Sequence, residues 1–408
     1  MRIHPFAALR PRPDIVGQVA APPYDTLDTA EAAALAKDNP MSFLHINHSE
    51  IDLPAGTNLY AEEVYAKAAE NFANFAKQGW LVREDRPLMY LYAQTMGSHT
   101  QTGLVCCAHI DDYVQDVIKK HEFTRKDKED DRTKHTAVLN ANIGPVFIAY
   151  RDVPAIRDAL APIPERTAPL YDFVDELNVR HRVWPVADPA PIVKLFAEQV
   201  PISYIADGHH RSASAVRVGT ERRAANPQHT GAEEYNWFLA VLFPGSALQI
   251  LPYNRAVKDL NGLASDAFLA KIKELFTVTE NPNPSPQNPC QISMYLGGKW
   301  YGLSWPAVTA DNPVDRLDVS TLQNRVLKPL LGIDDPRTSQ RISFIGGIRG
   351  PQELVRLVDQ KGYAVAFSMY PTTVDQLMAI ADAGQIMPPK STWFEPKLRT
   401  GLLSHELN

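Results

Sequence analysis

The residues with the most chemical potential in the sequence form the run Asp207-Gly208-His209-His210-Arg211. An apolar, β-prone stretch precedes this run and small helix-compatible residues follow it, which predicts a tight turn from a strand into a helix. Gly208 can adopt backbone angles that side chains forbid. Free amides at a helix start, two imidazoles and a guanidinium together suit a phosphate group. We therefore predict that Gly208, His209, His210 and Arg211 bind phosphate, and that Asp207 and His209 act in catalysis.

An ordinary structural explanation of the same five residues is also open. Asp207 could cap the helix, the two histidines could lie on the surface, and Arg211 could simply pair with Asp207. The run nevertheless resembles the signature of the ParB and sulfiredoxin superfamily, and most closely its free-serine kinase branch, which phosphorylates the hydroxyl of free serine with ADP or ATP. Sulfiredoxins carry a reactive Cys where this sequence has His209. The resemblance implies a ParB/sulfiredoxin-like core, and Mg²⁺ with ADP or ATP as cofactor.

Two further segments offer carboxylates. In Pro22-Pro23-Tyr24-Asp25 the prolines impose an extended path that delivers Tyr24 and Asp25 to a defined place, so both are candidates for substrate binding. The alternative is a rigid loop. The charged stretch 119–135 reads as a solvated loop, yet it contains Glu122, which is our candidate for the acid-base carboxylate. Asp25 is the second candidate for that role.

Three more sites complete the predicted set. Asn142 precedes a buried strand, and Arg255 follows a strand after the main motif; both are predicted to contact substrate, although Arg255 could equally be an ordinary surface residue. Lys390, Ser391 and Thr392 follow a double proline and offer a cation and two hydroxyls, which could close over phosphate oxygens. The alternative for these three is an ordinary docking loop.

The motifs as a set resemble a widespread prokaryotic family of unknown function over nearly the full length. They are Pro22-Pro-Tyr-Asp25, His121-Glu122, Asn142-x-Gly-Pro145, Asp207-Gly-His-His-Arg211 and Met387-Pro-Pro-Lys-Ser-Thr392. Only the fourth of them carries the resemblance to serine kinases.

The elements that position these residues predict an α+β protein. A chain of 408 residues with 45% hydrophobic residues is longer than one hydrophobic core usually organises. We expect a ParB/sulfiredoxin-like domain over 1–255, a second α/β domain over 256–383 and a tail over 384–408 that returns to the site. Alternating apolar residues predict two hairpins, at 88–110 and 170–183. Gly297-Gly298, between the runs 292–296 and 300–305, predicts a third. Strands are also expected at 42–46 and near 343–345, and helices at 60–77 and 190–199.

Composition narrows the class of function. The net charge of −6 argues against a protein that binds nucleic acid through bulk electrostatics. Three Cys form neither a disulfide framework nor a zinc pattern. No apolar run approaches the ~20 residues needed to span a bilayer, and no signal core opens the chain. We therefore expect a cytoplasmic protein that acts on small molecules and binds neither nucleic acid nor a membrane.

The leading hypothesis is a phosphotransferase that moves phosphate from a nucleotide to the hydroxyl of a small metabolite, with free serine as one possibility. Positioning and charge neutralisation carry most of such catalysis, and the residue types fit that demand. One alternative is a nucleotide-binding regulatory module without turnover. Another is a metal-dependent hydrolase that uses Asp207, His209 and His210. DNA binding ranks last, because no basic recognition helix stands out.

Overall fold

The computed structural model describes residues 1–408, and the chain forms two compact units. Unit 1 comprises Met1–Leu248 together with Pro396–Asn408, and unit 2 comprises Gln249–Glu395. The predicted α+β class is confirmed. The first unit ends at Leu248, whereas the sequence placed that limit at residue 255, and the tail joins unit 1 only from Pro396.

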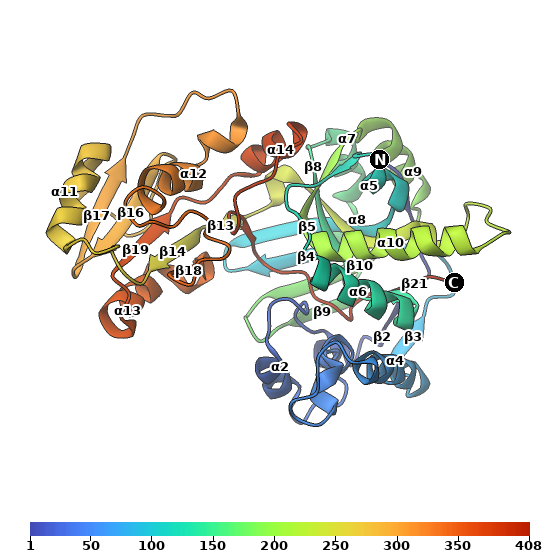
Figure 1. The fold of residues 1–408 in the computed structure, drawn as a ribbon. Coiled ribbons are helices and arrows are strands. Elements are labelled where there is room, and N and C mark those ends of the chain that lie inside the picture. The colour runs from blue at the N-terminus through green and yellow to red at the C-terminus, as the bar shows by residue number, and fades with distance from the viewer. The chain divides into compact units, whose positions relative to one another are not determined.

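A nine-stranded mixed sheet forms the centre of unit 1 (Figure 1). Its strand order is β6-β11-β8-β12-β5-β4-β10-β9, and β1 pairs with β5. Both predicted hairpins are confirmed, because β4 pairs with β5 and β9 with β10 in antiparallel register. The strands are β1 (Ile3–His4), β4 (Met89–Met96), β5 (His99–His109), β6 (Ile118–Lys119), β8 (Val146–Tyr150), β9 (Tyr171–Val174), β10 (Arg180–Val186), β11 (Ser203–Asp207) and β12 (Trp237–Pro244).

One face of this sheet packs under helices. Side chains alternate along β5, so Leu104, Cys106 and Ala108 join the main hydrophobic core while Cys107 points to the opposite face. Apolar residues of the covering helices, such as Phe196 and Val216, complete that core. The helices that follow the sheet strands are α5 (Ile110–Val114), α7 (Pro154–Leu160), α8 (Ile163–Arg166), α9 (Ala190–Gln199) and α10 (His209–Ala225).

The N-terminal segment of unit 1 builds a second core around Phe43, Phe72 and Phe75. The predicted helix over 60–77 is confirmed as α4 (Glu62–Lys77). The strand predicted at 42–46 is wrong, because its apolar residues form a short buried helix, α3 (Leu44–Asn47); a short apolar run does not separate the two structures. The remaining elements here are α1 (Val16–Val19), α2 (Thr29–Ala36), and the paired strands β2 (Leu9–Pro11) and β3 (Leu81–Arg83).

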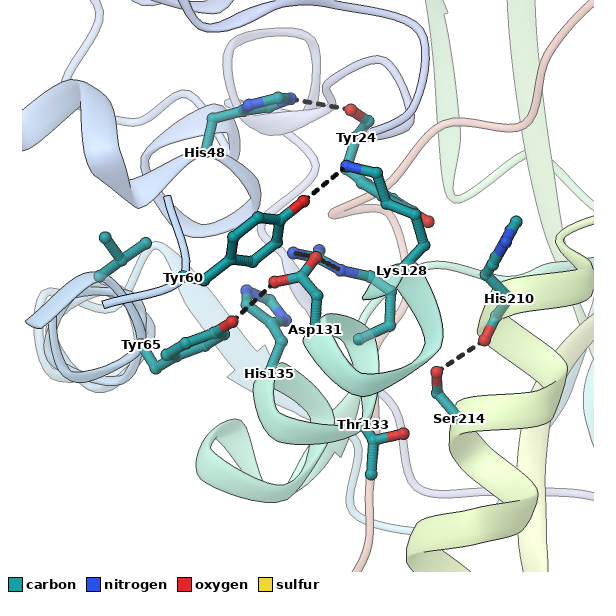
Figure 2. Close-up of polar contacts among 12 residues, drawn as sticks. Tyr24, His48, Tyr60, Tyr65, Lys128, Asp131, Thr133, His135, His210 and Ser214 are labelled. Carbon is teal, nitrogen blue, oxygen red and sulfur yellow. Dashed lines mark hydrogen bonds and ion pairs between the residues drawn. The ribbon is translucent and has the colours of Figure 1, made fainter. Parts of the chain in front are cut away.

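The charged stretch that we expected to be a loop forms a helix for most of its length, α6 (Lys126–Leu139). It is polar on every side, and such a helix needs polar partners. Those partners are present: the Tyr65 hydroxyl donates to Asp131 at 2.9 Å, and His135 Nε2 lies 3.1 Å from the carbonyl oxygen of Ile46. Figure 2 shows α6 between the N-terminal helices and α10.

The tail packs back on unit 1, as predicted, from Pro396 onwards. Backbone hydrogen bonds join Thr400 to Ala21, and β21 (His405–Glu406) pairs with β7 (Ala141–Asn142). The buried amide of Gln94 donates to the carbonyl oxygen of Lys397 at 2.8 Å. Gln94 lies on the sheet face opposite the main core, since Leu91 and Ala93 of the same strand point the other way. The tail therefore crosses the sheet on that second face.

Unit 2 contains a six-stranded antiparallel sheet in the order β15-β17-β16-β19-β14-β18. Gly297 and Gly298 form the turn between β16 and β17, where the sequence predicts a hairpin. Its strands are β14 (Tyr253–Val257), β15 (Thr277–Glu280), β16 (Gln291–Leu296), β17 (Lys299–Ser304), β18 (Ile342–Gly346) and β19 (Val365–Met369), with β13 (Ile250–Leu251) and β20 (Trp393–Phe394) as a separate pair. Its helices are α11 (Ser265–Leu275), α12 (Asp318–Leu322), α13 (Gly350–Lys361) and α14 (Val374–Asp382).

Across both units, none of the helices combines the length and the apolar character that crossing a membrane requires.

Candidate functional site

The main motif forms the strand, turn and helix that its sequence predicts. Strand β11 ends at Asp207, Gly208 makes the turn, and α10 begins at His209. Gly208 has φ +92° and ψ +32°, in the left-handed region that favours glycine. A Cβ atom at this position would also lie 3.1 Å from the guanidinium carbon of Arg211. Both the backbone angle and the close approach of Arg211 therefore favour glycine here.

A β-bulge sets the direction of the Asp207 side chain. Ile205 pairs with Ile148 of β8, but Asp207 pairs with Phe147, so Ala206 is the extra residue between them. Ile148 and Phe147 point to opposite faces of the sheet, because side chains alternate along a strand. The bulge thus turns Asp207 away from the main core and onto the face that the tail crosses.

On that face two cations hold the Asp207 carboxylate. Lys397 Nζ lies 3.4 Å from its Oδ2, and Arg211 Nη2 lies 3.3 Å from the same oxygen. Burial alone would raise the pKa of Asp207, but Lys397 and Arg211 outweigh it and hold the pKa well below its ordinary value. Asp207 is therefore ionised at neutral pH. The ordinary explanation of the motif is right that Arg211 pairs with Asp207, but Asp207 does not cap α10, whose N-cap is Gly208.

The start of α10 has no side-chain cap, and its first side chain is buried. His209 is 5% exposed, and its ring meets the ring of His121 edge to face at 4.5 Å. His209 Nδ1 lies 3.7 Å from Glu122 Oε2, whereas His209 Nε2 and His121 Nδ1 are buried without a hydrogen-bond partner. Burial lowers the pKa of His121 to about 4 and that of His209 well below its ordinary value. Both rings are therefore neutral at pH 7.

The second histidine of the motif fixes the segment that carries His121 and Glu122. His210 Nε2 accepts the backbone N–H of Arg125 at 3.0 Å, which leaves Nδ1 of the neutral ring as a donor. Figure 2 shows His210 on the first turn of α10, where its carbonyl oxygen accepts the Ser214 hydroxyl at 2.7 Å. Burial also lowers the pKa of His210. His209 and His210 therefore both contact segment 121–125.

Arg211 connects this turn to the other predicted motifs. Its Nη1 donates to the carbonyl oxygen of Pro145, and its Nε is buried without a partner. Tyr24, Asn142 and Arg211 line one small cavity of about 40 Å³, which has room for a water molecule and not for a nucleotide. The negative charge of Asp25, which is exposed, raises the pKa values of Arg211 and His210 against the effect of burial.

The structure thus gathers Tyr24, Asp25, Glu122, Asn142 and the main motif around the start of α10, from four separate segments of unit 1. Sequence reasoning missed Lys397 and Arg132. Lys397 comes from the tail, and no local pattern connects it to Asp207. Arg132 lies over the ring of Tyr24 at 4.2 Å; its position in a charged run gave no signal.

The other predicted site residues belong to unit 2. Arg255 is buried, and its Nη2 donates to the carbonyl oxygen of Lys390 at 3.0 Å. The Ser391 hydroxyl donates to the carbonyl oxygen of Pro388 at 2.6 Å, while Thr392 is half-buried. The phosphate-binding roles of Lys390, Ser391 and Thr392, and the substrate-binding role of Arg255, stay predictions. No group of three or more His, Cys, Asp or Glu side chains in the chain is arranged to hold a metal ion.

Comparison with known proteins places this chain in a family. The family model described as "Protein of unknown function (DUF1015)" matches residues 3–320. No curated protein matches the sequence.

Solved structures give only distant similarities. A mutant free serine kinase in complex with ADP has 14% identity and a TM-score of 0.36, covering 71% of this chain and 87% of that chain. A conserved hypothetical protein from Pyrococcus furiosus has 13% identity and a TM-score of 0.34, covering 73% and 95%. C-terminally truncated SbnI from Staphylococcus aureus has 11% identity and a TM-score of 0.38, covering 73% and 86%.

Proposed function

This chain belongs to the family described as Protein of unknown function (DUF1015), and from its site we propose that it is a nucleotide-dependent phosphotransferase. Its acceptor is the hydroxyl of a small metabolite, with free serine as the first candidate. The donor is ADP or ATP. The resemblance of Asp207-Gly208-His209-His210-Arg211 to the free-serine kinase signature supports this choice of donor and acceptor.

The observation that carries the proposal is the uncapped start of α10 with buried polar nitrogens around it that have no partner. The first backbone amides of this 17-residue helix receive no side-chain cap, and the positive end of the helix dipole favours an anion there. His209 Nε2 and Arg211 Nε are buried and have no partner. Buried polar groups are normally satisfied. Arg211 Nε can only donate, so it indicates a missing acceptor such as a phosphate oxygen.

The charges of the site suit phosphoryl transfer. Arg211 and Lys397 supply two cations, while the neutral imidazoles of His209 and His210 can donate hydrogen bonds without adding charge. Asp207 orients both cations through its Oδ2. Transfer of a phosphoryl group depends mainly on such positioning and on neutralisation of the phosphate charge. Asp207 therefore acts here as a positioning residue for Arg211 and Lys397.

A carboxylate must accept the proton of the attacking hydroxyl. Glu122 is the first candidate, because it lies beside His209 at the start of α10 and its side chain is 59% exposed, so an acceptor can reach it. Asp25 is the second. With ADP as donor, the hydroxyl oxygen bonds to the β-phosphorus, AMP leaves with the bridging oxygen, and the proton passes to this carboxylate.

Mg²⁺ would enter with the nucleotide. It is usually held by one or two carboxylates together with phosphate oxygens, and Glu122 and Asp25 are the carboxylates at the turn that can take that part. Bound there, Mg²⁺ would neutralise phosphate charge.

The test is a ³¹P NMR spectrum of the protein with Mg-ADP or Mg-ATP and L-serine. We expect a phosphoserine resonance together with AMP or ADP. Arg211→Gln should abolish this product, because the guanidinium is lost from the turn. Arg217→Gln, an exposed arginine two turns further along α10 that pairs with Asp130 and Glu221, should retain it.

Absence of phosphoserine with both donors would remove serine as the acceptor. Equal activity in Arg211→Gln and Arg217→Gln would remove the start of α10 as the place of transfer. Glu122→Gln and Asp25→Asn identify the carboxylate that acts as the base. The variant that loses turnover but still binds nucleotide shows which of the two residues it is.

A further inference from the structure

Unit 2 contains a buried guanidinium that no carboxylate neutralises. Arg255 lies on β14 with 4% of its surface exposed, and no Asp or Glu forms an ion pair with it. Its hydrogen bonds go to the backbone carbonyl oxygens of Tyr253 and Lys390. Arg399, which is equally buried in unit 1, pairs with Asp175 at 2.6 Å. Arg255 is thus a buried charge that lacks the counter-ion that such residues normally have.

An uncompensated buried charge is costly to the fold. Charged side chains are almost never fully buried unless they are paired, because removing them from water costs several kcal/mol. Burial lowers the pKa of Arg255 to about 10, so the guanidinium is still protonated at neutral pH. An anion bound beside it would supply the missing charge.

Arg255 lines a cavity of unit 2 with a volume of about 380 Å³. This volume is in the range of small-molecule sites. Much of the wall is apolar and comes from Phe344, Leu327 and Val319, together with two prolines of the segment before Lys390. Asp334, Asp335 and Arg337 also line the cavity, and Arg337 pairs with Asp335 at 2.8 Å. Arg255 is therefore the cation of this cavity that has no carboxylate partner, and the rest of the wall is mainly apolar.

A second unsatisfied group lines the same cavity. Gln323 donates its amide to the carbonyl oxygen of Ile333 at 2.8 Å, but its Oε1 is buried without a donor. Gln323 begins a π-helical turn that ends at Leu327, in which Lys328 N–H donates to the carbonyl oxygen of Gln323. Such turns are rare overall, but those that occur are often at functional sites. The residues that line this cavity thus include an unused acceptor, Gln323, as well as Arg255.

We propose that this cavity of unit 2 binds a small molecule that carries a carboxylate or phosphate group and an N–H or O–H donor. The anionic group pairs with Arg255, the donor bonds Gln323 Oε1, and the remaining atoms pack on Phe344 and Leu327. This site does not depend on the phosphotransferase activity proposed for unit 1.

The test follows the guanidinium NMR signals of the full chain labelled with ¹⁵N and ¹³C in arginine, at constant ionic strength. The probes are L-lactate, which carries a carboxylate and a hydroxyl, acetate, which lacks the hydroxyl, and inorganic phosphate. We expect the Arg255 signal to shift and saturate with lactate or with phosphate. The anion that binds with the higher affinity identifies the anionic group of the ligand. The exposed Arg217 serves as control and should not saturate. The same response is expected in the Arg211→Gln variant.

Gln323→Leu tests the donor contact without removing the cation. It should weaken lactate binding about tenfold, the value of one hydrogen bond, and leave acetate binding unchanged. The proposal is overturned if neither lactate nor phosphate shifts the Arg255 signal, if that signal only follows the signal of Arg217, or if the response disappears in Arg211→Gln. Equal affinity for lactate and acetate in the unmodified protein would overturn the role of Gln323.

Discussion

Replacing Lys397 by Met tests whether the tail holds Asp207 in its ionised form. The charges lie 3.4 Å apart, and Coulomb's law with an effective dielectric constant of about 20 gives about 5 kcal/mol for such a pair. The lost desolvation of Lys397 offsets part of this energy. The side chains of Lys397 and Asp207 are also 21% and 28% exposed. We therefore expect Lys397→Met to lower the stability of the turn by ~1–3 kcal/mol at pH 7.

The effect should depend on pH in a defined direction. The folded pKa of Asp207 lies below its unfolded value, so its contribution to stability is complete above an unfolded pKa of about 4 and is lost as the pH falls through the folded pKa. Lys397→Met raises the folded pKa towards the unfolded value. The stability difference between the two proteins should therefore be largest at neutral pH and shrink in acid.

Native-state hydrogen exchange of the amides in α10 is the suitable assay, because a chain with two units need not unfold in one transition. Lys126→Met is the matched control: it removes an exposed ion pair with Asp130 and should leave the protection of α10 almost unchanged. Equal protection of α10 in Lys397→Met and the unmodified protein at pH 7 would refute this reasoning. So would a loss of protection of the same size at pH 7 and in acid.

Three further predictions use the same assay. Burial lowers the pKa of His121 in the folded protein to about 4. The contribution of this neutral ring to stability is therefore complete above an unfolded pKa of about 6.5, and it declines by roughly 3 kcal/mol as the pH falls to the folded value. His121→Asn should remove this pH dependence of stability, and an unchanged dependence would contradict the buried neutral ring. Gly208→Ala should lower the free energy of unfolding by about 1 kcal/mol more than Gly231→Ala, because both glycines have φ +92° but only Gly208 meets a side chain. Equal losses of stability would argue against the close approach of Arg211. Arg399→Met should destabilise unit 1 by about 1–3 kcal/mol, since Asp175 loses a charged partner at 2.6 Å and keeps only His181 at 2.9 Å and backbone N–H groups. Retained protection of the tail amides would count against that pair.

The elements with strong local signals were predictable. The two hairpins of unit 1 and the Gly297-Gly298 turn follow from alternation and glycine position, and the structure has them in antiparallel register. The turn at Gly208 was equally clear, because a glycine between an apolar run and a helix-forming run has few other uses.

The failures have a common physical cause. Helix α6 has almost no apolar stripe, and its stability depends on polar contacts with distant residues, as in the Tyr65 hydroxyl with Asp131. Lys397 reaches Asp207 across 190 residues of sequence, and the bulge at Ala206 that directs Asp207 towards it is set by pairing with β8. Interactions of this kind exist only once the chain has folded, and no window of sequence contains them.

A crystal structure of the protein with ADP would test the central claim most directly. We expect the terminal phosphate over the start of α10, with its oxygens within hydrogen-bond distance of backbone amides of residues 209–211 and of His209 Nε2 or Arg211 Nε. A nucleotide bound away from this turn, with both of those nitrogens still unpaired, would contradict the account.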